Sequence, residues 1–149
     1  MSTPGVYYPP VGFHFKVVFQ IPGAEEIDSR FQSVSGLSVE YDTEIFKEGG
    51  ENRFEHKLPI RTRYPDLSLK RGMVVNSPLV GWCLSAFQER LIVPVTMFVT
   101  LLNENHVPLK TWSIYNAWPK KWSVSDLNAQ ESTIVIESLD LCYSYFKIL

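Results

Sequence analysis

Hydrophobic and polar residues alternate along several stretches of the chain with the two-residue period of β-strands. Residues 13–21 place an apolar side chain at every odd position, and Pro22 and Gly23 end the run. Residues 37–45 alternate again, with apolar side chains or threonine at the odd positions and serine or acidic side chains at the even ones. Each run predicts a strand with one buried face.

The same pattern predicts further strands after the Gly49-Gly50 pair. Leu67 and Leu69 are expected to face inward, and the closing strand is expected to be bulged because its alternation is imperfect. Residues 61–65 are predicted to be a loop, and residues 103–106 a tight turn between two long strands. In chain order the predicted strands are 54–60, 66–72, 91–102, 107–124 and 132–149.

One stretch has the periodicity of a helix instead. Asn76 and Ser77 supply a cap and Pro78 a first-turn proline, which together predict a helix start. Apolar residues then recur at helical spacing from Leu79 to Phe87. This apolar stripe is expected to pack on a sheet.

Six or seven antiparallel strands and one helix predict a mainly β fold. We expect an antiparallel β-barrel or two-sheet sandwich with one flanking α-helix and an extended hairpin. Residues 1–12 contain three prolines, which helix interiors exclude, and are predicted to form an extended N-terminal arm. Residues 13–149 are predicted to form a single β-barrel domain.

The composition fits a folded protein, since 45% of the 149 residues are hydrophobic and 20% are charged. Cys83 and Cys142 lack metal-ligand spacing and are too few for a disulfide framework. The sequence has no recognisable secretory signal and no apolar run long enough to span a membrane. We therefore expect assembly in the cytoplasm.

Charge is unevenly distributed. Residues 24–46 carry six acidic residues against one arginine, whereas residues 47–73 carry seven basic residues against four acidic ones. Such adjacent blocks of opposite sign can pair within one fold or between copies of it. The net charge of −2 argues against a nucleic-acid partner, because nucleic-acid binders are usually basic overall.

No catalytic, cofactor or metal site is predicted. The stretch "EGGENR" lacks the Lys-Ser/Thr ending and following helix of a phosphate-binding loop, and the glycine pair suits a hairpin tip instead. His14, His56 and His106 lie far apart in sequence and outside ligand motifs. The acidic face at residues 40, 42 and 44 is expected to be solvated or to face another subunit.

Several motifs in one order carry a resemblance: "FQSVSGLSVEYD", "EGGENRFEHKLP", "LSLKRGM", "PLVGWC" and "NAWPKKWSVSDLNAQESTIVIESLDLCY". Together they resemble the tail tube protein family of contractile phages and extracellular contractile injection systems, which is related to the type VI secretion tube protein. The resemblance implies a tail-tube-like domain forming hexameric rings. The rings would stack into a hollow conduit inside a contractile sheath, as a structural subunit and not an enzyme, with no cofactor.

The resemblance also implies contact sites. The hairpin tip from Glu48 to Arg53 would reach a neighbouring ring. The segment "HKLPIRTRYPDLSLKRG" and the aromatic end "YSYFKIL" resemble the baseplate-proximal, tube-initiating kind of tube protein. Candidate inter-ring or inter-subunit contacts are Glu40, Asp42, Glu44, Lys47, Glu48, Gly49, Gly50, Glu51, Asn52, Arg53, Lys70 and Arg71, and candidate baseplate contacts are Tyr143, Tyr145 and Phe146.

The implied partners are further copies of the chain, neighbouring rings and tube paralogues, and sheath and baseplate proteins. The particle itself would be phage tail-like and extracellular or cell-anchored after release. Two alternatives stay open on the residues alone. The C-terminal aromatics could simply complete the core face of the last strand, and the chain could be a monomeric β-barrel that binds a small ligand.

Overall fold

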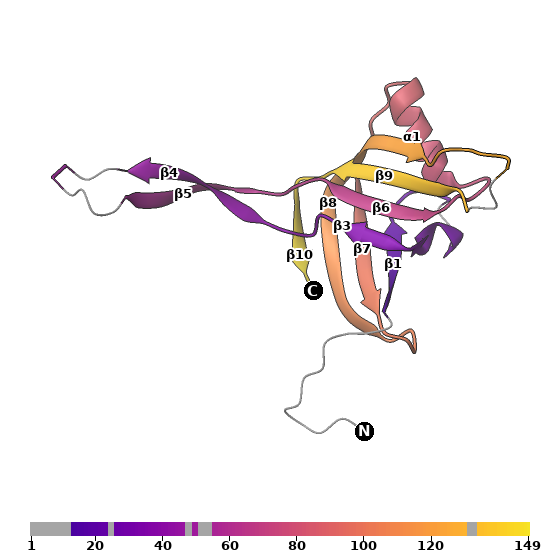
Figure 1. Cartoon of the computed structure of the whole chain (residues 1–149), viewed down its shortest axis with the longest axis horizontal. Coiled ribbons are helices and arrows are strands. Elements are labelled where there is room, and N and C mark those ends of the chain that lie inside the picture. The colour runs from indigo at the N-terminus through magenta and orange to yellow at the C-terminus, as the bar shows by residue number, and fades with distance from the viewer. Residues whose placement is uncertain (1–12, 24–25, 47–48, 51–54, 131–133) are drawn as a thin grey trace.

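The computed structural model describes residues 13–23, 26–46, 49–50, 55–130 and 134–149. Figure 1 shows a curved sheet with one helix at its end and a long two-stranded hairpin that projects away from it. The predicted arm at residues 1–12 lies outside the described residues. The elements are β1 (His14–Phe19), η1 (Glu26–Ser29), β2 (Arg30–Phe31), β3 (Ser33–Ser35), β4 (Glu40–Phe46), β5 (His56–Arg63), β6 (Leu67–Gly72), α1 (Pro78–Gln88), β7 (Val95–Leu102), β8 (Pro108–Val124), β9 (Ile136–Cys142) and β10 (Tyr145–Ile148).

The main sheet is antiparallel in every pairing, in the order β2-β1-β7-β8-β9-β6-β3, with β10 added beside β8. Its two end strands follow one another in the chain and are joined by Gln32, whose N–H donates to Lys70 O at 2.8 Å. β2 and β3 do not pair with each other, so the sheet curls without closing. The mainly β, antiparallel class is confirmed, although the sheet is not a closed barrel.

The described part of the chain has ten strands instead of six or seven. Two short strands, β2 and β3, were not predicted, and the last segment divides into β9 and β10. The division follows from β8, which pairs with β10 through residues 112–115 and with β9 through residues 118–124. Between these stretches Asn116 has a φ of 59°, a left-handed conformation that redirects the strand.

The predicted inward faces are largely confirmed. Leu67 and Leu69 are fully buried, and the helix packs its apolar stripe into the same core. Ser77 caps α1 by accepting a bond from Val80 N at 3.3 Å, with Pro78 in the first turn. Ile134, within the predicted closing strand at residues 132–149, is exposed and lies ahead of β9. The buried core consists of Val17, Phe19, Phe31, Leu67, Leu69, Leu79, Trp82, Cys83, Met97, Val99, Ile114, Ala117, Leu139 and Leu141.

Gly36 allows a close approach between two backbone segments. Its φ is 97°, and a Cβ at this position would lie 2.1 Å from Asp66 O. No side chain fits at such a distance, so only glycine lets the segment after β3 pass the start of β6.

A buried ionic network joins five elements. Arg71 on β6 donates from Nε to Glu137 Oε2 on β9 at 2.8 Å and from Nη1 to Asp28 Oδ1 in η1 at 3.0 Å. Its Nη2 donates to Ser77 Oγ at the start of α1, at 3.0 Å. Trp122 Nε1 on β8 donates to Glu137 Oε1 at 2.8 Å, so both carboxylate oxygens of Glu137 accept bonds.

Asp28 also bonds directly to the helix N-terminus, because Leu79 N donates to its Oδ2 at 3.2 Å and Ser77 Oγ donates to its Oδ1. A carboxylate at this end of a helix is stabilised by the unpaired N–H groups and the helix dipole. The network therefore compensates two carboxylates with one guanidinium and one helix end.

Replacing Arg71 with Met is predicted to destabilise the fold strongly. The variant leaves Asp28 and Glu137 buried without their cation, a loss of about 3–5 kcal/mol when one partner of a buried pair is removed. Urea denaturation followed by circular dichroism measures the change. Lys70→Met, on the same strand but exposed, should change stability by less than about 0.5 kcal/mol.

If Arg71→Met does not fold, a triple variant that also carries Asp28→Asn and Glu137→Gln removes the orphaned charges and should recover much of the stability. Equal stability of Arg71→Met and wild type would show that the network contributes nothing.

Candidate assembly surfaces

The β4–β5 hairpin lies outside the main sheet, and its two described strands pair only with each other. Figure 1 shows it extending far from the rest of the domain. A register shift between Tyr41 and Thr43 places two residues of β5 opposite one of β4. The predicted loop at residues 61–65 is wrong in its first part, because residues 61–63 complete β5 and lengthen the hairpin stem.

Both faces of this hairpin are exposed, although its sequence alternates like a half-buried strand. Tyr41 is 62%, Ile45 55%, Leu58 50% and Ile60 54% exposed. An isolated two-stranded hairpin is marginally stable in water, and exposed apolar clusters mark interaction sites. The hairpin thus presents an apolar surface that nothing in the described chain covers.

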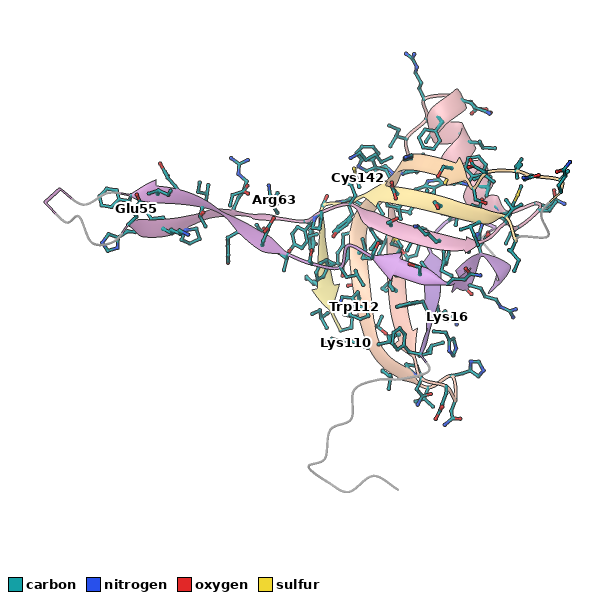
Figure 2. The ribbon with its side chains drawn as sticks, in the orientation of Figure 1. Lys16, Glu55, Arg63, Lys110, Trp112 and Cys142 are labelled. Atoms are coloured by element: carbon teal, nitrogen blue, oxygen red, sulfur yellow. The ribbon has the colours of Figure 1, made fainter. Side chains whose placement is uncertain are left out.

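The acidic residues of β4 are partly compensated within the hairpin. Figure 2 labels Arg63 on the stem, where its guanidinium bonds Glu40 and lies 3.6 Å from Asp42 Oδ1. The Glu40 bond and charge raise the pKa of Arg63. Among the described residues, no cation lies within ion-pair distance of Glu44. The two blocks of opposite charge therefore meet, at least here, inside one chain.

At the hairpin turn, Gly49 and Gly50 are exposed, and Gly50 has the positive φ, 88°, that the predicted tip requires. Lys47, Glu48, Glu51, Asn52 and Arg53 lie outside the described residues. Their role as contacts stays a prediction.

The two adjacent contact candidates Lys70 and Arg71 lie in different environments, one on the surface and the other in the interior. Lys70 is exposed, whereas Arg71 is 2% exposed and bonded on all sides within its own chain. The prediction of Arg71 as an intersubunit contact is wrong for this reason. The burial of Arg71 could have been predicted from the sequence, since Leu67, Leu69 and Arg71 share one face of an alternating strand.

The C-terminal aromatics divide in the same way. Tyr143 and Phe146 pack against the core and make edge contacts with Tyr64, with ring centroids 5.8 and 5.2 Å apart. Burial first, and then the neighbouring Tyr64, raises the pKa of Tyr143 to about 12. These two rings support the alternative in which they complete the core. Tyr145 instead stacks on Tyr115 at 4.8 Å and stays partly exposed.

An ion pair that the sequence did not suggest lies at the base of the hairpin. Lys120 Nζ donates to Asp66 Oδ2 at 2.7 Å, which lowers the pKa of Asp66, and Cys142 Sγ donates to Asp66 Oδ1 at 3.5 Å. Figure 2 labels Cys142 near the point where the hairpin leaves the sheet. The contact joins the segment after the hairpin to the C-terminal part of β8.

The described residues contain no group of three or more His, Cys, Asp or Glu side chains placed to hold a metal ion. Within the same residues, no helix is both long and apolar enough to cross a membrane.

The sequence comparison identifies the class of protein. The model of the T4-like virus tail tube protein gp19 matches residues 11–147. Because the match covers nearly the whole chain, the chain belongs to this tail tube protein family. The class expected from the motifs, a structural tail tube protein of contractile injection systems, is confirmed.

Solved structures place the chain among particular relatives. A chain in the anti-feeding prophage baseplate is 30% identical, with a TM-score of 0.79, over 100% of this chain and 97% of its own. A chain in the PVC sheath-tube complex of an extracellular contractile injection system is 24% identical, with a TM-score of 0.78, over 99% of each chain.

Hcp1 from Flavobacterium johnsoniae is 12% identical, with a TM-score of 0.54, over 91% of this chain and 94% of its own. The likenesses to the PVC chain and to Hcp1 show the fold alone. A search of curated proteins found no match.

The two thiols are predicted to differ in reactivity. Burial, with the nearby Glu137 charge, raises the pKa of Cys83 to about 12. At pH 8 almost none of it is therefore thiolate, the reactive form. Burial and the bond to Asp66 also raise the pKa of Cys142, but that thiol is only partly covered. With a disulfide reagent such as DTNB at pH 8, Cys142 should react slowly and Cys83 only after unfolding.

The Cys142→Ser variant is the control, because its native form should release no thiol signal until denaturant is added. Rapid reaction of Cys83 in that native variant would contradict the packed core around it.

Proposed function

We propose that six copies of this chain form a ring, that such rings belong to the inner tube of a contractile injection system, and that this chain forms the baseplate-proximal ring that initiates the tube. The observation that carries the proposal is the β4–β5 hairpin. It is a structured element whose apolar side chains lie in solvent in the single chain. Such an exposed apolar element is stabilised when another molecule covers it.

The hairpin favours another copy of the chain as that molecule. Neighbours in a ring or stack meet through the same surfaces on every copy, so a projecting arm on one copy finds its receiving surface on the next. Apolar side chains on both strands of the arm, Tyr41 and Ile45 on β4 and Leu58 and Ile60 on β5, can then be buried at once.

Charge adds specificity at this contact. Glu44 and the exposed Lys70 remain as contact candidates from the described part of the two charged blocks, while Glu40 and Asp42 already have Arg63 beside them. The tip residues 47–53 complete the candidate contact. Rim charges of this kind select partners and orientation more than they add affinity.

The baseplate-proximal position is supported by the relative that is 30% identical, a chain in the structure of the anti-feeding prophage baseplate. The tube-containing PVC structure matches at 24%. Tyr145, stacked on Tyr115 and partly exposed, is the C-terminal aromatic best placed to contact a baseplate protein. Sheath proteins and tube paralogues are the further partners we propose.

The proposed role is structural and involves no catalysis. Assembly would take place in the cytoplasm, and the ring would then remain part of a phage tail-like particle. The alternative of a small-ligand barrel is disfavoured because the core of the described residues is filled by side chains, whereas the groove of about 830 Å³ at the His14 end of the sheet is open. The cavity beside Phe31, Cys83 and Leu139 measures about 10 Å³, which is room for about one water molecule.

Replacing Ile45 with Asp is predicted to prevent ring formation without unfolding the domain. Ile45 is half-exposed on the hairpin, so the change in stability should stay within about 0.5 kcal/mol, as for most surface substitutions. Burying the new carboxylate against another copy carries a desolvation cost at every contact in the ring. Negative-stain electron microscopy of particles, with thermal melts of the purified chain, measures both effects.

The matched control is Ile134→Asp, an exposed isoleucine ahead of β9 and away from the hairpin, which should assemble normally. Normal particle yield with Ile45→Asp would refute the hairpin as an assembly contact.

The number of copies per particle distinguishes an initiating ring from the repeating tube. Quantitative mass spectrometry against a sheath subunit should find about six or twelve copies if the chain forms an initiating ring. Parity with the sheath would contradict the initiating role and make this chain the repeating tube subunit.

A further inference from the structure

Two histidines that are distant in sequence meet at one end of the sheet. His14 begins β1, and His106 lies in the turn between β7 and β8, the end at which Figure 1 shows β1 starting beside that turn. His14 Nε2 and His106 Nδ1 are 2.8 Å apart, and the two rings meet edge to face with centroids 4.7 Å apart. Both line an open groove of about 830 Å³.

Each histidine lies on backbone that is held by strand pairing or turn hydrogen bonds. His14 pairs with Leu102 across β1 and β7, one residue before the turn. The turn is clamped by Asn103, whose Oδ1 accepts bonds from Asn105 N at 2.8 Å and Val107 N at 2.9 Å. His106 N donates to Asn103 O at 3.0 Å. The two ring nitrogens are therefore brought together by the fold.

The turn also holds His106 in an uncommon conformation. Its φ is 62°, in the left-handed region that non-glycine residues seldom adopt. The imidazole of this residue contacts that of His14 at the start of β1. Backbone outliers of this kind cluster at functional sites, and this one lies where two histidine side chains meet.

From this geometry we propose that His14 and His106 form a binding site for a divalent transition-metal ion of the Cu²⁺ or Ni²⁺ class. Imidazole nitrogen is a preferred ligand for these ions. Two nitrogens 2.8 Å apart, each about 2.0–2.1 Å from a shared ion, subtend roughly 85–90° at it. This is the angle of adjacent ligands in square-planar or tetragonal coordination, which Cu²⁺ and Ni²⁺ prefer.

Tetrahedral Zn²⁺ fits less well, because its ligands are separated by a wider angle of about 109°. Water or another small ligand fills the remaining positions of a Cu²⁺ or Ni²⁺ ion. The ion replaces the hydrogen bond between the rings. Both contacting nitrogens must then be unprotonated, so the remaining protons reside on His14 Nδ1 and His106 Nε2. When both rings are neutral, one of them changes tautomer through solvent and no net proton is released.

The surroundings set the expected strength of the site. Lys16 on β1 and Arg30 on β2 line the same groove, and Glu104 lies in the turn. Figure 2 labels Lys16 near this end of the sheet. The two fixed cations oppose a dication, so metal affinity should be moderate. It should rise with ionic strength, because salt screens their repulsion.

The test uses the untagged full-length chain and Cu²⁺ itself, with binding followed by calorimetry and by electron paramagnetic resonance. Wild type should bind one ion per chain and give a tetragonal Cu²⁺ spectrum with two nitrogen ligands. His14→Gln and His106→Gln should each weaken binding about tenfold or more, because removing a ligand costs at least as much as disturbing its supporting shell. His56→Gln on the hairpin is the matched control and should bind like wild type.

Absence of Cu²⁺ binding by wild type, or binding that survives both His14→Gln and His106→Gln, would overturn the proposal. So would loss of binding in His56→Gln. The site lies within one chain, so its failure would leave the ring assembly untouched, and the copy number per particle would test that assembly separately.

Discussion

The fold depends on one buried guanidinium. Arg71 connects β6 to β9 through Glu137, to η1 through Asp28 and to the start of α1 through Ser77. Burying these charges costs desolvation energy, which is offset only when every donor and acceptor is paired. Among the described residues, no buried side-chain nitrogen or oxygen lacks a partner. The network therefore has one well-paired arrangement, and that arrangement fixes the helix on the sheet and the register of β6 against β9.

The hairpin depends on this rigid body through its base. Tyr64, at the end of the stem, packs against Tyr143 and Phe146 beside the core, and Asp66 is tied to Lys120. On the other strand, Gly36 passes against Asp66 O. Both ends of the hairpin are thus anchored within a few residues of each other. The part of the hairpin beyond these anchors makes no comparable contacts with the sheet among the described residues. The base therefore sets the direction of the hairpin, and contacts with another molecule must stabilise the rest of it.

The sequence was sufficient for the helix, for the longer strands and for much of the core, because alternation and capping residues act locally. It could not separate β4 from a core strand, since both alternate and only the tertiary arrangement decides whether a face is covered. The burial of Arg71 and Glu137 was partly readable, as each shares its strand face with buried leucines at 67, 69, 139 and 141. Alternation could not predict that Arg71 pairs with Glu137, because these two residues are 66 positions apart in the sequence and meet only when β6 pairs with β9.

The positions of the charges change the physical character of the proposed assembly. Opposite-sign blocks in the sequence favour an electrostatic contact between copies. In the structure, however, Arg71 is paired with acidic residues inside the core, and Arg63 lies beside Glu40 and Asp42. The hairpin exposes large apolar side chains among its charged ones, and burial of the apolar area stabilises association by roughly 25 cal/mol per Å². The apolar part of such a contact is little affected by salt, whereas its exposed ion pairs are screened. In the proposed ring, the apolar part of the hairpin contact would therefore persist at salt concentrations that screen its charges.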